Sequence, residues 1–257
     1  MKAVILAGGL GTRMREETEF RPKPMVEIGG KPILWHLMKL LSVQGITDFV
    51  VCTGYKAEVI RDYFISYNSR NLDFTTQLGQ NATPVFHGSH DESKWNVTVA
   101  DTGQLTMTGG RVRRIREYVG EERFFLTYGD GLANVDISAL IEAHERLQAT
   151  VTISTTRPTS RFGVVSKDTD GRVLQFLEKP LASDDVNIGY MIAEPELFSL
   201  LEEDDVLEEG PLRALAEKRM LGSYHHDGFW QPMDTQREAQ ALNVLWDSGS
   251  APWKTWD

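Results

Sequence analysis

The chain has 257 residues, of which 41% are hydrophobic, and carries a formal net charge of −10 at pH 7. This length and composition are enough for one large α/β domain with a full core, and we predict a single domain over residues 1–257. An acidic chain is a poor general partner for nucleic acid or an anionic membrane, so neither is expected. The N-terminal apolar run has only five residues, too few to cross a membrane, and we expect a cytoplasmic protein.

The first predicted element is the apolar run over residues 3–7, which is typical of a buried parallel strand. Glycines follow at positions 8, 9 and 11. Because glycine permits a sharp turn and lets an anion approach the backbone, several amide N–H groups can converge there on phosphate oxygens. We therefore predict a phosphate-binding loop made of Leu6, Ala7, Gly8, Gly9, Leu10, Gly11, Thr12 and Arg13.

Two cations accompany this loop. Arg13 ends it, and Lys23 follows ten residues later between Pro22 and Pro24. The prolines restrict the backbone on both sides of the lysine and so limit where its side chain can point. We interpret the loop and the two cations as a site for a nucleoside triphosphate. The alternative is a plain strand-to-helix turn with solvated charges.

Two better-known glycine motifs are excluded. The dinucleotide fingerprint GxGxxG needs a glycine three residues after Gly11, where Met14 stands, so a dehydrogenase is disfavoured. The P-loop GxxxxGK[ST] needs a lysine directly after its last glycine, and Gly11 is followed by Thr12.

The elements that follow alternate between helix and strand. A helix is predicted over 33–43, a strand over 46–53 and a helix over 56–67. The strand contains the single cysteine, Cys52, which we expect to be a buried core thiol because one cysteine cannot form a disulfide within the chain. This alternation predicts a Rossmann-like, mostly parallel but mixed sheet flanked by helices.

The second half of the chain continues this pattern. The predicted helices are 111–119, 139–147, a helix starting at 194, 211–220 and 235–246, and the predicted strands are 123–128, 149–156, 186–192 and 223–230. Residues 162–167 and 172–176 flank the turn signal Asp168-Thr169-Asp170-Gly171, which predicts a β-hairpin. The tryptophan-rich tail, residues 250–257, is expected to dock on the domain or on a neighbouring subunit.

Residues 68–108 interrupt the alternation. They are polar, with β-like patches at 72–77, 84–86 and 96–100, and we predict a β-rich insertion beside the sheet. Inserted loops in α/β enzymes often carry specificity. Small residues at the end of the insertion could let the backbone contact a flat base, and an ordinary loop is the alternative. These residues are Thr102, Gly103, Gly109 and Gly110, followed by Arg111.

Two aspartates are candidate metal ligands. Asp130 follows the predicted strand 123–128, and ligands of open α/β sheets bind beyond the carboxyl ends of the strands. Mg²⁺ prefers carboxylate and phosphate oxygens, so Asp130 fits that role, with an ordinary Asp-Gly turn as the alternative. Asp234 precedes the predicted helix 235–246, where an N-cap is the alternative.

The residues 6–13 and the segment Pro22-Lys23-Pro24-Met25 together resemble the sugar-1-phosphate nucleotidyltransferase family, whose signature is LAGGxGTR followed by P-K-P-M. The resemblance implies a fold of the nucleotide-diphospho-sugar transferase type. It also implies that Lys23 meets the α-phosphate, Arg13 the leaving pyrophosphate, and Asp130 with Asp234 the Mg²⁺ cofactor. The nucleotide is then expected to contact the loop, the insertion residues named above, and Tyr128 with Gly129.

Three segments resemble the sugar-phosphate site of this family. Glu178-Lys179-Pro180 is similar to its E-K-P, which implies that Glu178 binds sugar hydroxyls and Lys179 the phosphate; a surface turn is the alternative. Arg161-Phe162-Gly163 is similar to the [YF]-G segment under the sugar. Asn187-Ile188-Gly189-Tyr190 is similar to the N-x-G-x strand, with Ile188 where many members have glycine.

Within the family, the chain is most similar to the cytidylyltransferase branch. The similarity lies in residues 24–36, 95–98, 101–103, 107–111 and the FWQPMDT run at 229–235, with Leu105 where a polar residue is more usual. It implies that CTP and glucose 1-phosphate give CDP-glucose, a precursor of bacterial surface polysaccharide, and that the protein is a homo-oligomer, specifically a hexamer.

Two alternatives to this assignment stay open. The first is the same chemistry with UTP or dTTP, which residues 68–111 would decide. The second is a sugar-nucleotide-binding regulator without turnover, and the presence of Arg13, Lys23, Asp130 and Asp234 together argues against it.

Overall fold

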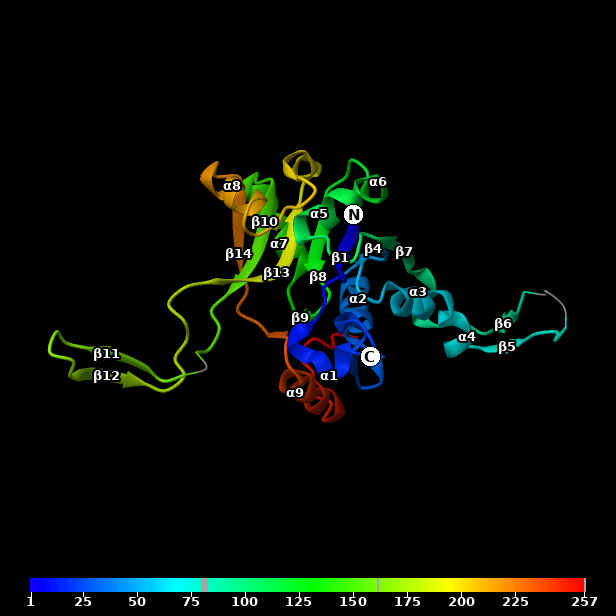
Figure 1. The fold of residues 1–257 in the computed structure, drawn as a ribbon, viewed down its shortest axis with the longest axis horizontal. Coiled ribbons are helices and arrows are strands. Elements are labelled where there is room, and N and C mark those ends of the chain that lie inside the picture. Colours follow the sequence, from blue (N-terminus) through cyan, green and yellow to red (C-terminus); the bar gives the residue numbers. More distant parts are fainter. Residues whose placement is uncertain (80–82, 161, 257) are drawn as a thin grey trace.

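A seven-stranded sheet forms the centre of the molecule, in the order β14-β10-β13-β8-β1-β4-β7 (Figure 1). The structure is a computed structural model that describes residues 1–79, 83–160 and 162–256. The strands are β1 Lys2–Leu6, β4 Asp48–Thr53, β7 Asn96–Asp101, β8 Phe124–Tyr128, β10 Val151–Thr156, β13 Val186–Ala193 and β14 Leu221–His225.

The sheet is mixed, as predicted. β1 lies in parallel between β4 and β8, with Ala3 opposite Phe49 on one side and Phe125 on the other. β13 runs antiparallel to both of its neighbours, β8 and β10. Because β1 is covered on both faces, it needs apolar side chains in both directions, which explains why its sequence is a continuous apolar run.

Helices cover both faces of the sheet and enclose two cores. Alternate residues of β1 enter different cores, with Ile5 in one and Val4 in the other. The first core is closed by α2 Ile33–Val43, α3 Ala57–Ile65, α7 Ile137–Leu147 and α9 Gln236–Asp247, and the second by α5 Thr108–Arg114, α6 Arg116–Val119 and α8 Pro211–Glu217. The remaining helices are the short α1 Arg15–Thr18 and α4 Tyr67–Asn71. No helix in the described ranges is both long and apolar enough to span a membrane.

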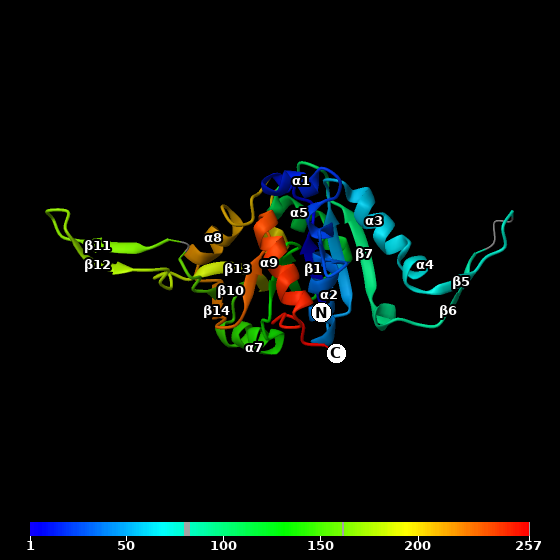
Figure 2. The same ribbon diagram turned by 90° about the horizontal axis from the view of Figure 1, so that it is seen from below.

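Two hairpin arms project from opposite ends of the molecule (Figures 1 and 2). One consists of β11 Val164–Lys167 and β12 Val173–Leu177, which confirms the hairpin predicted around residues 168–171. The other consists of β5 Asp73–Thr75 and β6 Val85–His87. Two further short pairs lie near the body, β2 Glu27–Ile28 with β3 Lys31–Pro32, and β9 Gly131–Ala133 with β15 Trp230–Pro232.

The predicted insertion over residues 68–108 is wrong in its second half. Residues 96–101 form β7, which pairs in parallel with β4 at the edge of the central sheet. An edge strand is only half covered, so its alternating sequence resembles that of a peripheral hairpin. The part that leaves the sheet is the arm that carries β5 and β6.

The C-terminal tail docks on the domain, as predicted. Trp253 is fully buried, and its ring, with those of Trp35, Trp246 and Trp256, packs around the imidazole of His36 on α2. His36 Nε2 lies 2.8 Å from the carbonyl oxygen of Ile28, and Trp253 Nε1 donates to His36 Nδ1 at 3.4 Å. Cys52 is buried as well, and burial raises the pKa of its thiol to about 12.

His36 makes the stability of the fold sensitive to acid. Burial is the main reason that its pKa falls from 6.5 to about 4. Between pH 6.5 and pH 4 the His36 imidazole is protonated in the unfolded chain but neutral in the folded chain. The free energy of unfolding should therefore fall by about 3 kcal/mol as the pH drops through this interval. Urea unfolding at pH 7 and pH 4.5 measures this. His36→Gln should lose clearly less stability over the same interval, and equal losses would contradict the assignment.

Candidate active site

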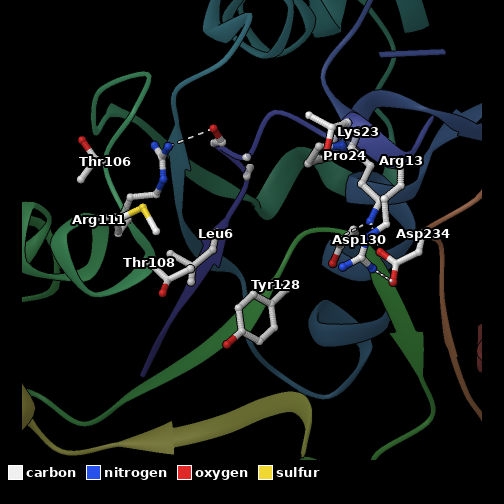
Figure 3. Close-up of a pocket in the computed structure, with 16 residues that line it drawn as sticks. Leu6, Arg13, Lys23, Pro24, Thr106, Thr108, Arg111, Tyr128, Asp130 and Asp234 are labelled. Atoms are coloured by element: carbon white, nitrogen blue, oxygen red, sulfur yellow. Dashed lines mark hydrogen bonds and ion pairs between the residues drawn. The ribbon is translucent and has the colours of Figure 1, made fainter. Parts of the chain in front are cut away.

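A pocket of about 390 Å³ opens at the carboxyl ends of β1 and β8. Its labelled residues form two groups, with Thr106, Thr108 and Arg111 at one side and Arg13, Lys23, Asp130 and Asp234 at the other (Figure 3). The predicted residues in its lining are Leu6, Ala7, Gly8, Gly9, Gly11, Thr12, Arg13, Lys23, Arg111, Tyr128, Asp130 and Asp234. The sequence motifs from three distant parts of the chain therefore meet in one cavity.

The glycine loop presents its backbone to this pocket. The N–H of Ala7 still donates to the carbonyl oxygen of Cys52 at 2.9 Å, so the sheet pairing ends there. Among the residues that the structure describes, no acceptor is found for the N–H groups at positions 8–11. Gly11 has a φ of +62°, a conformation that other residues rarely adopt. The loop can therefore direct several N–H donors at an anion.

Arg111 holds the loop in place from behind. It is 4% exposed, and its guanidinium donates to the carbonyl oxygens of Gly8 at 2.9 Å, Thr53 at 3.1 Å and Gly103 at 2.7 Å. A Cβ at Gly8 would lie 2.1 Å from the guanidinium and would displace it, and one at Gly54 would lie 2.5 Å from the guanidinium and 2.6 Å from the carbonyl oxygen of Gly103, so Gly54 has no room for a side chain. Burial lowers the pKa of Arg111. The contact of Arg111 with the nucleotide stays a prediction. The sequence did not indicate that Arg111 would bind the backbone of the glycine loop.

Lys23 bridges the two candidate metal ligands. Its Nζ lies 2.6 Å from Asp130 Oδ2 and 2.5 Å from Asp234 Oδ1, while Arg13 Nη1 lies 3.0 Å from Asp234 Oδ2. Burial opposes the charge on Lys23, but the ion pairs with the two aspartates outweigh it and raise the pKa of the lysine. Two cations and two carboxylates thus form one cluster at the edge of the pocket.

Pairing of two short strands brings the aspartates together. Gly131 of β9 lies opposite Pro232 of β15, and the N–H of Met233 donates to the carbonyl oxygen of Asp130 at 2.8 Å. The N-cap of α9 is Thr235, which forms a capping box with Glu238, so the interpretation of Asp234 as the cap is wrong. The carboxylate of Asp234 is therefore turned to Lys23 and Arg13.

A second hollow adjoins the pocket on the other side of these aspartates. It has a volume of about 130 Å³, and Tyr128, Asp130 and Asp234 line both cavities. The hydroxyl of Tyr128 donates to Glu208, and its ring covers Gly189 so closely that a Cβ there would lie 2.3 Å from Cδ2. The φ of Gly189, +81°, adds a second reason for glycine. The paired carboxylates therefore stand at the junction of two binding hollows.

The predicted sugar-phosphate residues are only partly gathered at this second hollow. Asn187 lines it and also lines a larger hollow of about 990 Å³ that contains Lys179. Tyr190 lines the second hollow as well, although its hydroxyl is engaged by the backbone: it accepts from the N–H of Ala133 at 3.0 Å and donates to the carbonyl oxygen of Gly131 at 3.3 Å. The described residues that line these hollows do not include Phe162, Gly163 or Glu178, which lie at the base of the β11–β12 arm. Arg161 falls outside the described residues.

Of the predicted residues at the end of the insertion, Arg111 lines the main pocket and the others do not. Thr102 is buried, and its N–H donates to the carbonyl oxygen of Thr53. Gly109 and Gly110 lie in α5, and their N–H groups donate to the carbonyl oxygen of Asp205. The lining of the main pocket instead contains Thr106, Met107 and Thr108, and it does not include Leu10, Thr102, Gly103, Gly109, Gly110 or Gly129. Thr108 is the first residue of α5 and belongs to the segment 107–111 that carries the branch resemblance, and Thr106 lies two residues before it.

Comparison with known proteins identifies the family of the chain. The family model described as nucleotidyl transferase matches residues 2–231. A glucose-1-phosphate cytidylyltransferase of Salmonella typhi is 48% identical over 260 residues, which cover 100% of both chains. The chain belongs to the nucleotidyl transferase family. A structure of HddC from Yersinia pseudotuberculosis complexed with GMP-PN has a TM-score of 0.69, with 23% identity, 95% of this chain and 99% of that chain covered.

The charged cluster lies where the two hollows meet, with Arg13 and Lys23 paired to the two aspartates. The structural relative supports the fold, including the mixed sheet and its flanking helices.

Arg111 should matter to the folded protein even without substrate. Arg111→Met would remove a charged donor from the carbonyl oxygens of Gly8, Thr53 and Gly103, and a hydrogen bond to a charged group contributes about 1.5–3 kcal/mol. We expect the free energy of unfolding, measured by urea titration of the substrate-free protein, to fall by about 3 kcal/mol or more. Arg113→Met is the control, since within the described residues this exposed arginine pairs with the surface carboxylate of Glu203, and its loss should cost clearly less. Similar losses in both variants would contradict the anchoring role.

Proposed function

We propose that the protein is a glucose-1-phosphate cytidylyltransferase that converts CTP and α-D-glucose 1-phosphate into CDP-glucose and pyrophosphate. The observation that carries the proposal is the Lys23–Asp130–Asp234 cluster at the junction of the two hollows. The 48% identity to the Salmonella typhi cytidylyltransferase over the whole chain supports the choice of substrates.

The reaction needs positioning rather than covalent catalysis. A phosphate oxygen of glucose 1-phosphate forms a bond to the α-phosphorus of CTP, and the bond from that phosphorus to the bridging oxygen of the β-phosphate breaks. The electron pair leaves with pyrophosphate. The loop N–H groups and Arg13 bind the departing phosphates, while Lys23 neutralises charge on the α-phosphate. Fixed donors of this kind lower the barrier because they need no reorganisation during the step.

Asp130 and Asp234 fit a magnesium site. Their oxygens already converge on one cation, the Lys23 ammonium, and carboxylate oxygens are the ligands that Mg²⁺ prefers. Within the described residues no group of three or more His, Cys, Asp or Glu side chains is arranged to hold a metal, so substrate phosphates and water would complete the shell. When bound, Mg²⁺ would reduce repulsion between the two anionic substrates.

We assign the base to the Arg111 side of the main pocket, where Thr106 and Thr108 lie (Figure 3). The phosphates would then extend along the glycine loop towards Lys23. UTP or dTTP in place of CTP is the alternative, because hydroxyl and backbone groups can both donate to and accept from a base. A sugar-nucleotide-binding regulator without turnover is the other alternative.

A nucleotide panel tests the proposal. The purified protein is incubated with glucose 1-phosphate, Mg²⁺ and either CTP, UTP, dTTP, ATP or GTP, and pyrophosphate release is measured. We expect CTP to have the highest kcat/KM, by about a factor of ten or more. Preference for another nucleotide would overturn the base assignment, and binding without release in every case would support the regulator.

Loss of either aspartate should abolish activity without unfolding the protein. Asp130→Asn and Asp234→Asn keep size and hydrogen bonding but each remove a charge, so we expect kcat to fall by about a factor of 100 or more. Raised Mg²⁺ or Mn²⁺ should restore part of it, while the melting temperature changes little. Because Thr235 is the helix cap, a normal rate in Asp234→Asn would leave that aspartate without a role in the reaction.

The arms support a homo-oligomer, and the branch resemblance suggests a hexamer. The β11–β12 arm exposes large apolar side chains on both faces, namely Val164, Val165, Val173, Leu174, Phe176 and Leu177. Apolar surface of this kind is typical of a docking segment, and we propose a second copy of the chain as its occupant. Light scattering should give a multiple of the 29.0 kDa chain mass, and a monomer would contradict the proposal.

The cellular setting follows from the substrates. CTP and sugar phosphates are cytoplasmic metabolites, and the single cysteine leaves no disulfide to form within the chain. We propose that the protein acts in the cytoplasm and supplies CDP-glucose for bacterial surface polysaccharide such as O-antigen.

A further inference from the structure

The ammonium of Lys23 occupies a defined point between two carboxylates. It lies 2.6 Å from Asp130 Oδ2 and 2.5 Å from Asp234 Oδ1, and its side chain is 11% exposed, whereas those of the aspartates are 35% and 34% exposed. Arg13 contacts only the other oxygen of Asp234. Lys23 is therefore the one cation in the described cluster that contacts both carboxylates.

A divalent cation bound by the same two oxygens would lie close to that point. Mg²⁺ binds carboxylate oxygens at about 2.0–2.1 Å, a few tenths of an ångström shorter than the two Lys23 contacts. The same two oxygens cannot hold an ammonium and a metal ion at such distances at once, because the two cations would overlap and repel. Lys23 and the metal thus exclude each other at this pair.

The Lys23 side chain can also reach an anion bound in the main pocket. Its backbone is fixed within the short turn Lys23–Met25, preceded by Pro22, and its side chain lines the same pocket as the glycine loop. The four-carbon stem can therefore turn from the aspartates to a phosphate held by the loop without moving the backbone. Without such a phosphate, an ammonium that left the aspartates would lose both ion pairs while the Lys23 side chain stayed largely buried.

We propose that Lys23 is an internal competitor for the Asp130–Asp234 metal site, and that the site binds a divalent cation well only when nucleotide phosphate gives Lys23 another anion. This inference rests on the proposed function, because it takes the two aspartates as the metal ligands. It makes metal and nucleotide binding mutually reinforcing, and it places the lysine against the phosphate once the metal is bound.

Mn²⁺ titration of the nucleotide-free protein, followed by the loss of the free-ion EPR signal, tests the competition. We expect Lys23→Met to bind Mn²⁺ about tenfold or more tightly than the wild type. The control is Lys218→Met, which removes the same charge from an exposed site and should change the affinity by less than about twofold. The gain in Lys23→Met should disappear when Asp130→Asn is added.

The outcomes separate this inference from the proposed function. If Lys23→Met and Lys23→Gln, both checked for folding by circular dichroism, bind Mn²⁺ no better than the wild type, the competition is overturned. If Asp130→Asn and Asp234→Asn still abolish Mn²⁺ binding in the presence of CTP, the metal site itself stands. If those two variants leave Mn²⁺ binding with CTP intact, the metal ligands were wrongly assigned and both ideas fail.

Discussion

The antiparallel pairing of β9 with β15 is the contact on which the candidate site depends. It ties the segment after β8 to the segment before α9, and the N–H of Met233 seals it by donating to Asp130. Without this pairing, no other contact described above would bring the carboxylates of Asp130 and Asp234 together. Two carboxylates this close repel unless a cation lies between them, and Lys23 supplies that cation in the folded chain.

Arg111 performs a similar task for the glycine loop. In the described residues the loop N–H groups make no backbone hydrogen bonds at positions 8–11, so the hydrogen bonds that fix the loop are accepted by its carbonyl groups. The buried guanidinium binds those of Gly8, Thr53 and Gly103, which joins the ends of β1 and β4 to the segment before α5. The Arg111 side of the pocket is thus organised in the protein without a ligand, and such preorganisation reduces the entropy lost on binding.

The aromatic cluster around His36 fixes the C-terminal tail against α2. The same helix packs against the turn Lys23–Met25, so one helix supports both the tail and the segment that carries Lys23. The β11–β12 arm, in contrast, carries its apolar residues away from the body, where only another surface can cover them.

The sequence by itself determined the features that depend on local pattern. The apolar run of β1, the glycine loop, the hairpin around Gly171 and the place of Asp130 after β8 all follow from periodicity and turn residues. About two thirds of the predicted nucleotide and metal residues line the pocket, because these motifs lie at the ends of strands that a parallel sheet brings together.

Only the tertiary structure decided the features that depend on distant partners. Whether residues 96–101 join the sheet depends on the free edge of β4, and whether Gly109 faces a ligand depends on the carbonyl oxygen of Asp205. Tyr190 supports the backbone of Gly131 and Ala133 through its hydroxyl. Each of these outcomes is set by hydrogen bonds between segments that are far apart in the chain, and no local pattern records which donor will meet which acceptor.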